Sequence, residues 1–167
     1  MSKHGENRTA EYEVTSHSPG DLADGDLGAC IAIIQCGGAV DPESADEELG
    51  RSEVIAIARK GANIVGVGAI KRLRTGYAST IAGSRKSGSY VDPNTPELGY
   101  VAVDTQHQKR GLSHRIVAEL LSRHQGRLFA TTFNEGMKKT LADAGFVRKG
   151  REWRGQKHNQ LSLWIKQ

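Results

Sequence analysis

The chain has 167 residues and a net charge of +4, and its length suits one domain with one sizeable core. Hydrophobic residues make up 37% and charged residues 25%, as in soluble globular proteins, and no apolar run reaches the about 18 residues that a transmembrane helix needs. The first residues, MSKHGENRTA, are polar and lack the apolar core of a signal peptide. We therefore expect a cytoplasmic protein without membrane contacts, with a flexible tail over residues 1–9 and one domain over residues 10–167.

The predicted elements follow from hydrophobic periodicity and turn residues. In chain order they are a strand over 11–16, a helix over 27–34, a loop or short helix over 41–50, a hairpin over 52–73, a strand over 97–103, a helix after Gly111, a strand over 126–133, a helix capped by Asn134 and ended by Gly145, and a final hairpin over 146–167. This order predicts a mixed α/β (α+β) fold with helices on both faces of one sheet. Residues 72–96 show no sustained period, and such long connections tend to be functional or disordered.

Two cysteines, Cys30 and Cys36, are too few for a disulfide framework. They are six residues apart on the first predicted helix, which places them on different faces. We interpret them as reduced, intracellular thiols in or near the core. The six histidines show no metal-ligand spacing, so we expect no metal site.

Charge is distributed unevenly along the chain. Residues 41–53 hold six acidic residues against one base, whereas residues 71–96 and residues 148–157 each hold five basic residues against one acid. Basic segments favour anionic ligands such as phosphates or nucleic acid, and the simpler alternative is a set of solvated surface charges. Both interpretations stay open at this point.

Residues 97–121, ELGYVAVDTQHQKRGLSHRIVAELL, run from a strand through a polar, basic turn into an amphipathic helix. Alternation predicts one strand face with Leu98, Tyr100 and Ala102 and the other with Glu97, Gly99, Val101 and Val103. The helix has an apolar stripe formed by Leu112, Ile116, Val117, Leu120 and Leu121.

The turn itself has the chemistry of an anion site. Its loop and first-turn N–H groups lack intrahelical partners, and the helix dipole is positive there. Gly111 allows close backbone approach, Ser113 adds a hydroxyl donor, and positive charge comes from Lys109, Arg110 and Arg115. A phosphate site and a plain strand–helix loop stay equally open on these grounds, since neither a dinucleotide-binding glycine fingerprint nor a P-loop is present.

The same residues resemble the acetyl-CoA signature of the GNAT superfamily of N-acetyltransferases. That signature is a hydrophobic strand residue followed, five residues on, by Q/R-x-x-G-x-G/A, and here it falls on Val103, Gln108, Lys109, Arg110, Gly111, Leu112 and Ser113. Ser113 departs from the pattern but is still small. Downstream, NEGMKKTLADAGF resembles the N-x-x-A-x-x-L-Y-x-x-x-G-F helix of the family, with Asn134, Gly145 and Phe146 in place. The resemblance covers roughly residues 53–146.

The resemblance implies a GNAT fold, which is a single mixed, mostly antiparallel sheet flanked by helices on both faces, with strands that splay at the acetyl-CoA site. It implies that the pantetheine arm is bound by the backbone of Tyr100, Val101, Ala102 and Val103, much as an added strand would be. It implies that the pyrophosphate is held by the N–H groups of Lys109, Arg110, Gly111, Leu112 and Ser113, and that Gln108 also belongs to the cofactor site. Asn134 would lie near the pantetheine or serve as a simple N-cap.

Acetyl transfer to an amine requires the unprotonated amine, so a base must assist, directly or through water. The strand ELGYVAV resembles the E-I/L-x-F/Y-x-A-I/V strand of the histone-acetyltransferase branch, whose glutamate is the base, and Glu97 holds that position. The alternative for Glu97 is a strand-edge carboxylate on a wet face. The tyrosine that often protonates the departing thiolate is replaced by Leu141, and Tyr100, Tyr77 or Tyr90 could substitute for it.

The resemblance therefore implies an acetyl-CoA-dependent N-acetyltransferase that acts on a primary amine of a small molecule or protein by direct attack in a ternary complex. The basic residues of the segment 72–86 would line or cover the acceptor site. One alternative is an acetyltransferase whose acceptor amine is carried on nucleic acid, such as charged tRNA, as the basic segments suggest. Another is a non-catalytic module that binds acetyl-CoA, as Leu141 suggests. A homodimer through the final hairpin also stays open.

Overall fold

Seven strands form one sheet in the order β1-β2-β3-β4-β5-β7-β6 in the computed structural model, which describes residues 11–36, 42–72, 94–154 and 160–167. The elements are β1 (Glu13–His17), the 3-10 turn η1 (Pro19–Asp21), α1 (Asp26–Cys36), α2 (Pro42–Gly50), β2 (Val54–Lys60), β3 (Asn63–Lys71), β4 (Glu97–Val103), the 3-10 turn η2 (Thr105–His107), α4 (Leu112–Ser122), β5 (Leu128–Thr132), α5 (Glu135–Asp143), β6 (Val147–Arg154) and β7 (Gln160–Lys166). The expected tail over residues 1–9 and most of the basic segment 72–96 lie outside the described residues.

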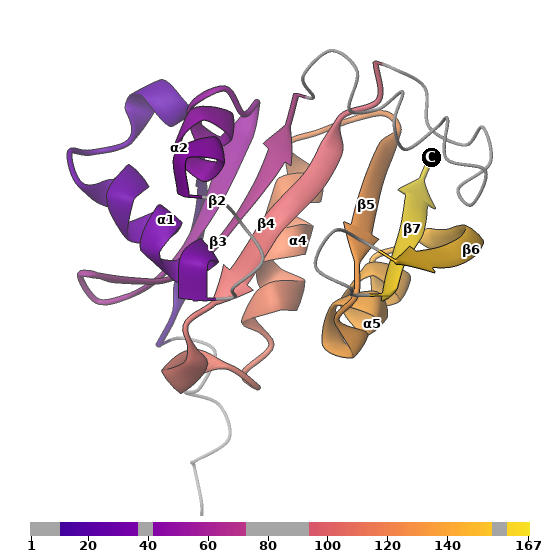
Figure 1. The fold of residues 1–167 in the computed structure, drawn as a ribbon. Helices are drawn as coiled ribbons and strands as arrows, with labels where there is room; N and C mark the ends of the chain where they lie inside the picture. The colour runs from indigo at the N-terminus through magenta and orange to yellow at the C-terminus, as the bar shows by residue number, and fades with distance from the viewer. Residues whose placement is uncertain (1–10, 37–41, 73–93, 155–159) are drawn as a thin grey trace, which may run out of the picture.

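The helices cover both faces of the sheet, which confirms the predicted fold class. Helices α1 and α2 pack on one face and α4 on the other, with α5 beside α4 (Figure 1). Strand β2 shows the alternation behind this arrangement, because Ile55 and Ile57 join the core under α1 while Val54, Ala56 and Ala58 join the core under α4. None of the helices in the described ranges is long and apolar enough to cross a membrane.

Two glycines of β3 bring α4 close to the sheet. An ideal Cβ built on Gly68 would stand 2.5 Å from Cγ2 of Ile116, and one on Gly66 would stand 3.0 Å from Cδ1 of the same side chain. The apolar stripe predicted for this helix is buried as expected, with Leu112, Ile116, Val117 and Leu120 in the core. This packing fixes the start of α4 against the middle of the sheet.

The sheet is antiparallel except at its centre, where β4 and β5 run parallel. These two strands share a single pair, Glu97 with Phe129, and the N–H of Phe129 donates to the carbonyl of Pro96 over 3.2 Å. No further β4–β5 pair follows along these two fully described strands. The splayed strands that the resemblance implied are therefore present (Figure 1).

A bulge in β4 changes the predicted facing of its side chains. Val67 pairs with Ala102 and Ala69 with Gly99, so Tyr100 and Val101 together face Gly68. Tyr100 takes φ 54°, which is left-handed backbone that few non-glycine residues adopt. The predicted alternation is wrong across this bulge, because the core under α4 receives Leu98, Val101 and Val103, while that under α1 receives Tyr100 and Ala102.

Candidate functional site

A cavity of about 620 Å³ lies where β4 and β5 part. It is lined by residues 98–103 of β4, the turn that leads into α4, the end of β5 and the start of α5, together with the end of α1. This volume is within the range of about 300–1,000 Å³ that is usual for small-molecule sites. Ten of the eleven residues predicted to bind the cofactor line it, namely Tyr100, Val101, Ala102, Val103, Gln108, Lys109, Gly111, Leu112, Ser113 and Asn134. Arg110 is not among the lining residues.

The turn before α4 presents its backbone rather than its side chains. Nε2 of Gln108 donates to the carbonyl of Val103 over 3.1 Å, so this side chain closes the turn. Lys109 (φ 63°) and Gly111 (φ 76°) both adopt left-handed backbone, and Gly111 is the N-cap residue of α4. Such alternation of backbone conformation gathers N–H groups into a concave anion-binding surface. An ideal Cβ on Gly111 would meet no described atom within 4 Å, so the space beside this glycine is open.

The N-terminal segment supports this turn, a role that the sequence did not predict. The hydroxyl of Tyr12 hydrogen-bonds Nδ1 of His107 over 2.9 Å, and Tyr12 is buried. Nη2 of Arg115 donates to the carbonyl of Tyr12 over 3.0 Å. Arg115, which we expected to add positive charge near the turn, thus also ties α4 to the start of the chain.

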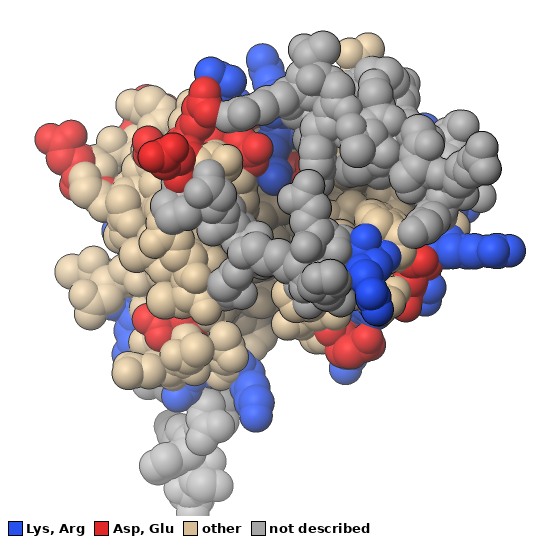
Figure 2. Space-filling view, viewed as in Figure 1, with Lys and Arg blue, Asp and Glu red and all other residues tan. Residues whose placement is uncertain are grey.

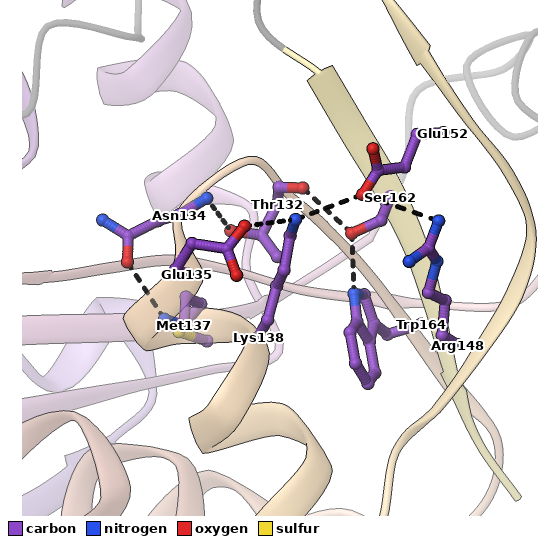
Figure 3. Close-up of polar contacts among 9 residues, drawn as sticks. All are labelled: Thr132, Asn134, Glu135, Met137, Lys138, Arg148, Glu152, Ser162 and Trp164. Atoms are coloured by element: carbon purple, nitrogen blue, oxygen red, sulfur yellow. Dashed lines mark hydrogen bonds and ion pairs between the residues drawn. The ribbon is translucent and has the colours of Figure 1, made fainter.

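The junction of β5 and α5, whose polar contacts Figure 3 shows, contributes residues to the lining of the cavity. Oδ1 of Asn134 accepts from the N–H of Met137 over 3.0 Å, which confirms Asn134 as the N-cap of α5. This bond uses the side-chain oxygen, and the Nδ2 group of Asn134 is a donor that could serve a ligand. The N–H of Asn134 donates to Oγ1 of Thr132, and the hydroxyl of Ser162 in β7 donates to the carbonyl of Thr132. The sheet thereby fixes where α5 begins.

Ion pairs hold α5 against β6 beside this junction. Nζ of Lys138 lies 2.8 Å from Oε1 of Glu135 and 3.2 Å from Oε1 of Glu152, and Nη2 of Arg148 lies 3.5 Å from the same atom of Glu152 (Figure 3). Basic and acidic side chains lie side by side over this part of the molecule, whereas acidic side chains gather over α2 (Figure 2). Part of the basic charge of the segment 148–157 is therefore balanced within the protein.

Glu97 lies in a polar cluster on the α2 side of β4. The residue is 5% exposed, and Nζ of Lys71 lies 3.4 Å from its Oε1. The same ammonium lies 3.4 Å from Oε2 of Glu48 and 4.0 Å from the ring centroid of Tyr100, whose hydroxyl donates to Glu48. Burial raises the pKa of Glu97, and the charge of Lys71 opposes that shift. The wet, strand-edge alternative for Glu97 is thus wrong.

Sequence reasoning missed Glu48 and Lys71 as members of this cluster. Each was counted only within a charged segment, and they lie 23 residues apart along the chain. The register of the β3–β4 ladder pairs Lys71 with Glu97, so a prediction of that register could have suggested the contact between these two residues. Glu97 does not line the cavity, whereas its neighbours Leu98 and Gly99 do.

The position of the missing tyrosine is filled by an apolar side chain. Leu141 is fully buried and lines the cavity next to Thr140. Of the three tyrosines considered as substitutes, Tyr100 lines the cavity, and Tyr77 and Tyr90 lie outside the described residues.

The two cysteines differ in environment. Cys30 lies on the buried side of α1, and burial raises the pKa of its thiol to about 11. Cys36, at the end of the same helix, is exposed and lines the cavity, so its interpretation as a thiol in or near the core is wrong. The described ranges contain no group of three His, Cys, Asp or Glu side chains that could hold a metal ion.

We compared the chain with known proteins by sequence and by structure. No family model matches the chain, and no curated protein matches it by sequence. Among solved structures, the Escherichia coli protein ElaA has a TM-score of 0.70 at 10% identity, over 93% of this chain and 99% of that one. An acyl-CoA N-acyltransferase from Pseudomonas aeruginosa has a TM-score of 0.67 at 10% identity, over 93% and 99%.

A GNAT family acetyltransferase from Elizabethkingia anophelis, solved with acetyl-CoA bound, has a TM-score of 0.64 at 13% identity, over 94% of this chain and 98% of that one. Identities of this size speak to architecture alone. The chain has the fold of the GNAT acetyltransferases, as its signature implied.

Proposed function

We propose that the protein is an acetyl-CoA-dependent N-acetyltransferase that transfers the acetyl group directly to a primary amine in a ternary complex. The observation that carries this proposal is the parting of β4 from β5 beyond the Glu97–Phe129 pair, beside a turn whose residues line the same cavity. A split sheet leaves backbone donors and acceptors without ladder partners, and an extended amide-bearing ligand can satisfy them.

The residues present fit acetyl-CoA. Backbone groups of β4 over residues 100–103 would bind the pantetheine arm, with the Nδ2 group of Asn134 as a further donor. The N–H groups around Gly111, at the positive end of α4, would hold the pyrophosphate, and the open space beside that glycine gives room for it. Ser113, which lines the cavity, adds a hydroxyl. When bound, acetyl-CoA supplies an activated acyl group with a thiolate as leaving group.

Glu97 is the base in this proposal. An amine of ordinary pKa near 10.4 is almost wholly protonated at neutral pH, so a proton must be removed before it can attack. Burial raises the pKa of Glu97, which brings this carboxylate nearer to the operating pH and makes it a better proton acceptor. Its Oε2 is buried and has no hydrogen-bond partner among the described residues. Because Glu97 does not itself line the cavity, that oxygen would take the proton of an acceptor ammonium through water.

The departing thiolate needs no dedicated acid in this site. A thiol has a pKa near 8.5, so the thiolate is a fair leaving group near neutral pH. Leu141 supplies no proton, and the hydroxyl of Tyr100 is engaged with Glu48. We therefore assign acid catalysis to no side chain.

The test is a screen for acetyl-CoA consumption over polyamines, amino acids, aminoglycosides, peptides and charged tRNA. With any acceptor found, Glu97→Gln should lower kcat by about 10²- to 10⁴-fold, the usual contribution of a general base, and leave the Kd for acetyl-CoA unchanged. Glu13→Gln, at an exposed position of β1, is the matched control and should keep full activity. An undiminished kcat for Glu97→Gln would show that another group is the base.

A non-catalytic acetyl-CoA-binding module is the second candidate, and the buried Leu141 at the tyrosine position favours it. It predicts a measurable Kd for acetyl-CoA with no turnover on any amine of the screen. Turnover that depends on Glu97 would exclude it.

A further inference from the structure

Four polar side chains from three elements meet behind β4. Glu48 comes from α2, Lys71 from the end of β3, and Glu97 and Tyr100 from β4. The side chain of Lys71 is 12% exposed and that of Glu97 is 7% exposed, so the contact between them is largely shielded from water. Among the described residues, the charged groups that act on Glu97 are Lys71 and Glu48, and Tyr100 contacts both of these.

The sequence builds this contact from cross-strand pairing and from one glycine. Lys71 and Glu97 are direct partners in the antiparallel β3–β4 ladder, at the end where the ladder stops. An ideal Cβ on Gly99 would stand 2.9 Å from Cε of Lys71 and 3.2 Å from Oε1 of Glu97. A Cβ at position 99 would therefore require the end of the Lys71 side chain to shift, so Gly99 leaves room for the lysine to pass across β4.

The two oxygens of Glu97 have different surroundings. Oε1 lies 3.4 Å from the ammonium of Lys71, whereas Oε2 is buried with no hydrogen-bond partner among the described residues. The ammonium itself is held on its other side by Glu48 and by the ring of Tyr100, which are joined by their own hydrogen bond. An anchored cation that pairs with one oxygen of a carboxylate fixes the orientation of the group. The second oxygen can then accept a hydrogen bond from another donor.

We propose that Lys71 is a positioning residue for Glu97: its ammonium, anchored by Glu48 and Tyr100, holds Oε1 and leaves Oε2 as the oxygen that takes the acceptor's proton. The inference rests on the proposed function in giving Glu97 the role of base. The contact also sets the charge of Glu97. Burial alone favours the neutral acid, and the nearby cation restores part of the carboxylate form that a base needs.

The test is a titration of the Glu97 carboxyl by ¹³C NMR in protein labelled at glutamate, with the resonance assigned by its loss in Glu97→Gln. Lys71→Met removes the cation and should move the titration midpoint of Glu97 to higher pH, and Lys71→Arg should restore it in large part. Lys60→Met is the matched control, because Lys60 pairs with Glu11 at an exposed site near the far end of the β2–β3 hairpin. In Lys60→Met, the titration midpoint of Glu97 should equal that of the unmodified protein.

Glu48→Gln gives a result of opposite sign and serves if Lys71→Met does not fold. It removes a like charge near Glu97 and leaves Glu97 as the remaining carboxylate partner of Lys71, so the midpoint should fall. With any acceptor from the screen, the acid limb of kcat/KM should move in the same direction as the midpoint of each variant, while the Kd for acetyl-CoA stays constant.

The two proposals fail separately. An unmoved Glu97 midpoint in folded Lys71→Met, or in Glu48→Gln, overturns the positioning role whatever the screen finds. A protein that binds acetyl-CoA and acetylates no amine overturns the proposed activity, and the titration still decides whether Lys71 controls Glu97.

Discussion

Replacing Gly111 by alanine should weaken acetyl-CoA binding at the turn before α4. Gly111 takes φ 76°, where an alanine is strained by about 1–2 kcal/mol. The turn can keep its shape and bear that strain, or relax toward negative φ and rotate the N–H groups away from the pyrophosphate. Loss of one hydrogen bond to a charged group is worth about 1.5–3 kcal/mol, so the Kd should rise by about 10- to 100-fold.

Gly61 provides a matched control for this substitution. It lies between β2 and β3 with φ 60°, and an ideal Cβ there also meets no described atom within 4 Å. Gly61→Ala should therefore bear similar strain, with a similar loss of about 1–2 kcal/mol in the free energy of unfolding, and leave the Kd unchanged.

The assay is isothermal titration calorimetry with acetyl-CoA and with acetyl-pantetheine, which lacks the pyrophosphate, alongside urea unfolding of each variant. Gly111→Ala should lose affinity for the first ligand and not for the second. Equal Kd values for acetyl-CoA in Gly111→Ala and Gly61→Ala would show that the turn does not bind the pyrophosphate.

Four further outcomes are expected. Because the pKa of Glu97 is raised in the folded protein, its ionisation adds no cost below the unfolded pKa and destabilises the fold increasingly as the pH rises from that value to the folded pKa. Glu97→Gln should therefore match the unmodified protein in acid and melt at a higher temperature near neutral pH. Asn134→Ala should lose about 1 kcal/mol of stability in urea unfolding through its lost N-cap bond. Gly68→Ala should lose about 1–3 kcal/mol by the same measurement, because its methyl overlaps a side chain of α4. An alkylating reagent at about pH 8 should label Cys36 and spare Cys30, whose pKa is raised to about 11, and acetyl-CoA should slow the labelling, as peptide mass spectrometry would show.

The local elements of the fold could be predicted because their signals lie within a few residues of one another. The stripe of α4 and the Asn134 cap of α5 are patterns of this kind, and the structure confirms both. The turn before α4 was also found from sequence, because its glycine and its neighbours occupy one short segment. The spacing of residue types along the chain was enough to predict the stripe, the cap and the turn.

The surroundings of Glu97 could not be predicted, because they depend on tertiary contacts. Glu48 lies in an acidic segment and Lys71 in a basic one, so each was interpreted as part of a charged stretch. Only the packing of α2 against the end of β3 brings them together with Glu97, and only burial changes the chemistry of that carboxylate. A search for patterns within single segments of the sequence detects neither this tertiary contact nor the effect of burial on Glu97.

The bulge at Tyr100 connects the two halves of the site. An extra residue in one strand bends it and increases its local twist, and this one lies just beyond the last pair between β4 and β5. The bend offers a physical reason why β4 leaves β5 there, and the same residue points its hydroxyl to Glu48 on the α2 side of the strand. A strained backbone and an opened ladder both cost free energy, and a fold retains them where something else satisfies the freed groups. The bulge therefore supports the proposed extended ligand between β4 and β5 on grounds that are independent of the signature motif.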